Sequence, residues 1–124
     1  MEEIEMVETN EAYLLRIYIG DSDRYMGKPL YKFLLEFFRK EGFAGATVLR
    51  GISGFGKTSI IHTASILRLS TDLPIVIEIV DKIEKIEKVL PVLKDVVKEG
   101  LITIEKVGVV FYNGNKKDNQ TLTP

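Results

Sequence analysis

The chain has 124 residues, 45% of them hydrophobic, which suits a single domain with one core. Its formal net charge of -1 argues against a protein whose main task is binding nucleic acid, because phosphate neutralisation needs an excess of lysine and arginine. The absence of cysteine excludes disulfides, thiolate nucleophiles and sulfur-rich zinc sites, and it fits a cytoplasmic protein. We expect an N-terminal extension at 1–11, one domain at 12–112 and a flexible polar tail at 113–124.

The first half of the chain predicts a strand, a helix and a second strand. Residues 12–20 (AYLLRIYIG) alternate apolar and polar side chains in the manner of a strand. A loop follows and closes at Pro29, after which apolar residues recur every three or four positions. This spacing predicts an amphipathic helix that begins at Leu30 and ends at Gly42. Residues 46–52 predict the second strand, which runs into a glycine-rich stretch.

The second half predicts further strands around one helix. A loop and then a strand near 65–69 are expected after the glycines. Residues 74–81 (PIVIEIVD) form a continuous apolar run, which indicates a strand that is buried on both faces or central in the sheet. Asp81 is placed to be the N-cap of a helix that starts at Ile83 and stops at Gly100. Residues 101–112 predict a last strand or a pair of short strands.

The order strand, helix, strand, strand, helix, strand is the βαββαβ unit of ferredoxin-like folds. The predicted fold class is therefore α+β, with two helices on one face of an antiparallel sheet. Because the predicted strands are apolar on both sides, the other face of the sheet would need a cover. Oligomerisation is the natural way to provide it.

Residues 51–58 (GISGFGKT) match the phosphate-loop pattern G-x-x-x-x-G-K-[ST]. The strand at 74–81 ends in an acidic residue, as the magnesium-binding strand of such enzymes does. However, a strand and a helix precede the pattern, and the chain beyond it is too short for a doubly wound parallel sheet. The glycines can cradle a phosphate with Lys57 beside it, or they can simply permit a tight turn with Lys57 in solvent.

Three long stretches resemble a known family: RIYIGDSDRYMGKPLY, AGATVLRGISGFGKTSIIHTA and LRLSTDLPIVIEIVD. Over about Ala12 to Tyr112 the chain resembles the PII-like family of signalling proteins, catalogued as a domain of unknown function. The resemblance implies a ferredoxin-like homotrimer that binds an adenine nucleotide (ADP, ATP or AMP) in clefts between subunits and requires no cofactor. A loop after the second strand would report the nucleotide to a protein target, for example a membrane transporter or an enzyme.

The resemblance also assigns binding residues. The GFGKT segment matches the base of the signalling loop in PII proteins, so it would line the nucleotide and couple it to the loop. Ile79 and Val80 match the strand that walls the adenine, with plain core positions as the alternative. Apart from the resemblance, Arg50 and Arg68 flank the loop in the sequence, so they can face the same cleft as Lys57 or be ordinary charges on the surface of the sheet. The expected binding set is Arg50, Gly51, Gly54, Phe55, Gly56, Lys57, Thr58, Ile79 and Val80.

No catalytic triad, carboxylate pair or metal-binding spacing stands out in the sequence. His62 is the single histidine, which is a weak signal for catalysis. We therefore expect no enzyme activity, no catalytic residue and no metal site. The alternatives are a phosphate-loop ATPase and a structural or metal-responsive trimer of the CutA type.

Overall fold

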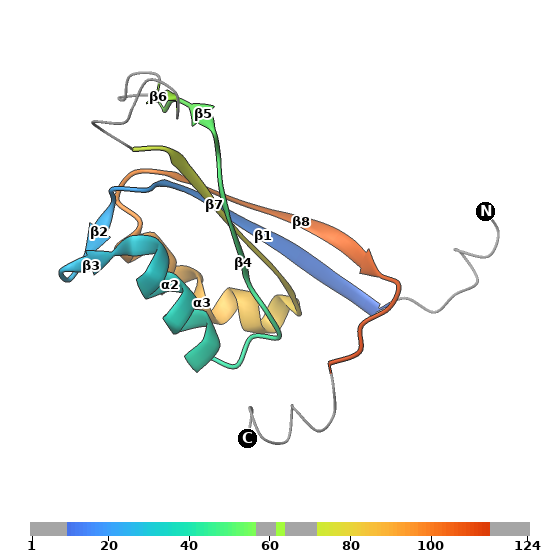
Figure 1. Cartoon of the computed structure of the whole chain (residues 1–124). Helices are drawn as coiled ribbons and strands as arrows, with labels where there is room; N and C mark the ends of the chain where they lie inside the picture. The colour runs from blue at the N-terminus through green and yellow to red at the C-terminus, as the bar shows by residue number, and fades with distance from the viewer. Residues whose placement is uncertain (1–9, 57–61, 64–71, 115–124) are drawn as a thin grey trace.

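Two helices cover one face of a four-stranded antiparallel sheet with the order β4-β7-β1-β8 (Figure 1). The computed structural model describes residues 10–56, 62–63 and 72–114. This arrangement confirms the predicted ferredoxin-like βαββαβ fold. The elements of the unit are β1 (Asn10–Gly20), α2 (Leu30–Lys40), β4 (Thr47–Arg50), β7 (Pro74–Asp81), α3 (Ile83–Val96) and β8 (Leu101–Val109).

Two short strand pairs lie outside this sheet. The segment predicted as a loop before α2 contains β2 (Arg24–Tyr25) and β3 (Lys28–Pro29), which pair with each other. After β4, β5 (Ser53–Gly54) pairs with β6 (His62–Thr63). The strand expected near 65–69 lies outside the described residues.

The core lies between the helices and one face of β1 and β7. Leu15 and Ile17 of β1 and Ile77 of β7 are fully buried. They pack with side chains of both helices, among them Leu34, Phe38, Ile86 and Leu93. The apolar run at 74–81 is therefore central, between β4 and β1, but in the single chain it is buried on one face only. Of the two predicted alternatives, the central place in the sheet is confirmed, whereas burial on both faces does not hold in the isolated chain, because both helices lie on the same side of the sheet (Figure 1).

Asp81 is not the N-cap of α3, because α3 starts at Ile83 and Lys82 occupies the N-cap position. The Asp81 carboxylate instead accepts hydrogen bonds from the Lys82 N–H at 2.8 Å and the Ala44 N–H at 3.0 Å. It thereby fastens the loop before β4 to the end of β7.

No helix among the described residues lies over the second face of the sheet. Alternation along the paired strands places apolar side chains on this open face, among them Leu14, Leu49, Val76, Val80, Leu101 and Val107. At its centre, Arg16 Nε lies 2.9 Å from Glu78 Oε2, and Arg16 Nη1 lies 3.5 Å from Glu105 Oε1. The open face is thus an apolar surface with a paired charge cluster at its middle.

Gly100, just before β8, tolerates no side chain. Its φ is 156°, and a Cβ there would collide with the Tyr18 carbonyl oxygen. We expect Gly100→Ala to lower the free energy of unfolding by about 1–3 kcal/mol, because backbone cannot move away cheaply. Urea denaturation measures the change. Gly45→Ala is the control, since a Cβ at Gly45 meets no atom within 4 Å; equal midpoints for the two variants would contradict the expectation.

Candidate functional site

The segments that end β1 and β4 and begin β7 meet at one end of the sheet, which we call the loop end. The Gly51 N–H donates to the Pro74 carbonyl oxygen at 2.7 Å. The Asp21 N–H donates to the Leu73 carbonyl oxygen at 2.8 Å. These two backbone bonds join the three segments. The β5–β6 pair lies beyond them at the same end (Figure 1).

Residues 51–56, which follow β4 and which we call the glycine turn, pack directly on β7. A Cβ on Gly51 would lie 3.0 Å from Pro74 Cγ, and a Cβ on Gly54 would lie 2.8 Å from the same atom. Both distances are shorter than ordinary van der Waals contacts. Position 54 therefore needs glycine so that the turn can pack closely on Pro74, and this requirement is independent of any ligand.

Arg50 supplies the positive charge at the loop end. Its Nη2 lies 2.9 Å from Asp21 Oδ1, and this hydrogen bond raises the pKa of the guanidinium. About half of the Arg50 side chain stays exposed, at 52%. Because a guanidinium has five N–H donors, Arg50 can bind an anion while it keeps Asp21.

Acidic side chains hold the neighbouring loops in place. The Ser22 N–H donates to Asp72 Oδ1, and the Gly20 N–H donates to Asp23 Oδ2, both at 3.0 Å. Burial raises the pKa of the Asp23 carboxyl above its ordinary value, and the nearby charges of Asp72 and Glu99 raise it further. The carboxylates of Asp23 and Asp72 therefore hold the backbone at Gly20 and Ser22 in position, next to the glycine turn.

The structure brings five of the predicted binding residues together at the loop end: Arg50, Gly51, Gly54, Phe55 and Gly56. The Phe55 side chain is largely exposed. Lys57, Thr58 and Arg68 lie outside the described residues. For His62 the structure describes the backbone alone, in β6.

Ile79 and Val80 lie near the opposite end of β7. Pro74 pairs with Gly20 whereas Val80 pairs with Leu14, and the six positions that separate Pro74 from Val80 span about 20 Å of strand. Ile79 is buried in the core, as the plain core-strand alternative expects, and Val80 is on the open face. One chain alone does not bring these two residues to the glycine turn.

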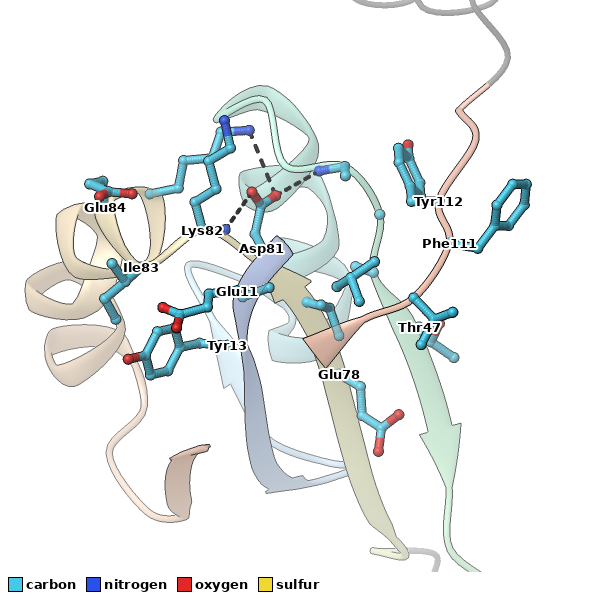
Figure 2. A pocket seen from close by; sticks show the side chains of 18 residues that line it. Glu11, Tyr13, Thr47, Glu78, Asp81, Lys82, Ile83, Glu84, Phe111 and Tyr112 are labelled. Atoms are coloured by element: carbon cyan, nitrogen blue, oxygen red, sulfur yellow. Dashed lines mark hydrogen bonds and ion pairs between the residues drawn. The ribbon is translucent and has the colours of Figure 1, made fainter. Parts of the chain in front are cut away.

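Sequence reasoning missed a concavity at that opposite end of the sheet (Figure 2). Its walls are Ala44–Thr47, Val80–Lys85 and the segment that follows β8, where Phe111 and Tyr112 are exposed. Asp81 lies inside it, bonded to Ala44 and Lys82. The small residues before β4 and the aromatic pair after β8 were the available signals.

The loop end does not have the architecture of a phosphate-loop enzyme. Ser53 and Gly54, inside the pattern, form a strand that pairs with β6, and the main sheet is antiparallel. A phosphate loop instead joins a strand of a parallel sheet to a helix. Across the described part of the chain, no three histidine, cysteine or acidic residues gather as metal ligands.

The ferredoxin-like fold of this chain is also the fold of PII-like proteins. The chain matches the family DUF190, described as "Uncharacterized ACR, COG1993", over residues 12–109, and it belongs to that family. A UPF0166 protein of Aquifex aeolicus is 44% identical over 98 residues, which are 79% of this chain and 92% of the relative. A UPF0166 protein of Methanocaldococcus jannaschii is 42% identical over 95 residues, which are 76% of this chain and 87% of the relative.

Solved structures show the same fold at low identity. The nitrogen regulatory PII-like protein CPII from Thiomonas intermedia K12, bound to ADP, AMP and bicarbonate, superposes with a TM-score of 0.63. It is 16% identical, and the match covers 85% of this chain and 93% of CPII. CPII bound to ADP and bicarbonate gives a TM-score of 0.58 at 16% identity, covering 85% of this chain and 94% of CPII.

Proposed function

We propose that this protein is a PII-like signalling protein that binds an adenine nucleotide in clefts between the subunits of a homotrimer. Binding would be relayed through the segment after β4 to a protein target, without chemistry on the nucleotide. The observation that carries the proposal is the glycine turn that packs on Pro74 beside Arg50. The solved structures of the PII-like protein CPII, described as bound to ADP and AMP, support the choice of ligand.

The turn has suitable chemistry for phosphate. Glycines have no Cβ, so the backbone of the turn can approach an anion closely, and the exposed part of Arg50 adds charge-assisted donors. Phe55, largely exposed, offers a ring for contact with the base. Lys57 and Thr58 complete the proposed phosphate contacts from the sequence. Of the two residues predicted to wall the adenine, Val80 has the exposed side chain, and we assign it an apolar contact across the subunit boundary.

The open face supports the homotrimer. Contiguous apolar surface without a cover is uncommon in monomeric proteins. Leu49, Val80 and Leu101 expose between 41% and 55% of their surface on this face. A second copy of the chain offers the same apolar chemistry and can cover it.

Thermal unfolding with ADP, ATP, AMP and GTP tests the ligand. A nucleotide present at 100 times its dissociation constant should stabilise the protein by about 2.7 kcal/mol. Arg50→Gln should reduce the nucleotide-induced rise in melting temperature, whereas Arg39→Gln on the exposed surface of α2 should leave that rise unchanged. No shift with any adenine nucleotide at millimolar concentration would overturn the proposal, and an equal shift in both variants would remove Arg50 from the site.

A further inference from the structure

Positive charge is concentrated in one short segment. Residues 24–40 contain five basic side chains and one acidic side chain, for a net charge of +4. The whole chain has 17 basic and 18 acidic residues, so the remaining residues carry 12 basic and 17 acidic side chains, a net charge of -5. Basic and acidic residues are therefore strongly segregated along the chain, although the overall net charge is only -1.

This segment folds into a single surface, made by the β2–β3 hairpin and the exposed side of α2. The Tyr25 and Phe33 ring centroids lie 4.6 Å apart, and Lys28 Nζ lies 2.8 Å from Glu36 Oε1, so the hairpin is fastened along the helix. We call it the basic surface. Its exposed members are Arg24, Met26, Lys28, Lys32, Arg39 and Lys40.

Met26 stands at the tip of the hairpin with 81% of its surface exposed. Its φ of 51° is in the left-handed region, and Gly27 follows with a φ of 83°. Asparagine followed by glycine suits such a two-residue turn best, so methionine is a costly choice for this backbone. Arg24 and Lys28 flank the tip, and Arg24 Nη2 donates to the Gly27 carbonyl oxygen at 2.8 Å. The hairpin projects from the body beside the start of α2 (Figure 1).

We propose that the basic surface binds an anionic phospholipid bilayer, with Met26 entering the interface and the lysines and arginines contacting the headgroups. The order of groups in the hairpin, an apolar tip backed by cations, matches the order of acyl chains and anionic headgroups in a leaflet. An acidic peptide or a nucleic acid would pair the cations but leave Met26 in water. Within the described residues no helix is long and apolar enough to span a membrane. The proposed contact is peripheral, and it does not depend on the proposed nucleotide site.

Three variants of the full chain separate the parts of this proposal. Met26→Asn removes the apolar tip and suits the left-handed backbone better, so it should keep or raise the melting temperature. Lys32→Gln with Lys40→Gln removes two charges from the basic surface and keeps good helix formers. Lys88→Gln with Lys94→Gln is the matched control, because these lysines are exposed on α3, outside the basic surface.

Co-sedimentation with phosphatidylcholine vesicles, with and without phosphatidylglycerol, measures binding. We expect binding only to the anionic vesicles and release at high salt. The Lys32/Lys40 pair should weaken binding about 25-fold, at about fivefold per charge, and Met26→Asn about tenfold. The control pair should bind clearly better than the Lys32/Lys40 variant.

Three results would overturn the proposal. The first is no binding to anionic vesicles. The second is a loss of binding in the control pair that equals the loss in the Lys32/Lys40 variant. The third is binding to polyglutamate or to duplex DNA that matches vesicle binding and is unchanged by Met26→Asn, which would assign the basic surface to an acidic partner. Nucleotide-induced stabilisation is measured separately, so failure of one proposal leaves the other intact.

Discussion

Replacing Val80 with aspartate is expected to convert the proposed trimer into monomers that keep their secondary structure. Val80 is 41% exposed on the open face, on the central strand β7 and opposite Leu14. In the assembly an aspartate there would be buried without a partner, which costs about 3–5 kcal/mol. Association should therefore weaken more than a hundredfold. Sedimentation velocity gives the mass, and circular dichroism shows whether the fold persists.

Val92→Asp is the control for this prediction. Val92 is 38% exposed, nearly the same as Val80, but it lies on α3, on the other side of the molecule from the open face. The same change in chemistry should leave the assembly intact. If wild type sediments as a monomer at micromolar concentration, or if both variants stay assembled, the homotrimer through the open face is wrong.

The charges on the open face are compatible with its being covered. Arg16 pairs with Glu78 on the neighbouring strand and reaches Glu105 on the other side. The hydrogen bond to Glu78 is the main cause that raises the pKa of Arg16. Covering the face would therefore desolvate a formed ion pair and not isolated charges, which is the less costly case.

Periodicity was sufficient to predict the elements of the main sheet and the helices. Leu15 and Ile17 alternate with Arg16, which predicts a strand. The apolar residues of α2 recur every three or four positions, which predicts a helix. The run at 74–81 has apolar residues on both faces. Its one-sided burial depends on which face both helices cover, and topology decides that.

Local features of the site were predictable, and features that depend on register were not. Gly51 and Gly54 are three positions apart in the sequence, and both lie against Pro74 in the turn. Ile79 and Val80 were assigned to one pocket, but consecutive residues of a strand point to opposite faces. Pairing with β1 fixes Ile79 toward the core. The β2–β3 hairpin escaped prediction because two residues per strand are too few for any periodic signal.

Gly54→Ala is expected to weaken nucleotide binding between tenfold and a hundredfold. The added Cβ would lie 2.8 Å from Pro74 Cγ, so either the turn or the proline ring must move. Displacing the turn lengthens the proposed hydrogen bonds to phosphate, and one charge-assisted bond is worth about 1.5–3 kcal/mol. Isothermal titration with ADP measures the loss. Gly45→Ala, where the Cβ meets open space, should bind like wild type.

A second substitution separates displacement of the turn from loss of glycine itself. Pro74→Ala removes the Cγ that the new Cβ would meet, so the double variant Gly54→Ala with Pro74→Ala should regain most of the affinity. Rescue would show that the packing of the turn on β7 sets the geometry of the ligand contacts. If Gly54→Ala binds ADP as tightly as wild type, the turn makes no contact with the nucleotide. If the single and double variants are equally weak, then the backbone conformation of Gly54, and not its distance from Pro74, is the property that binding requires.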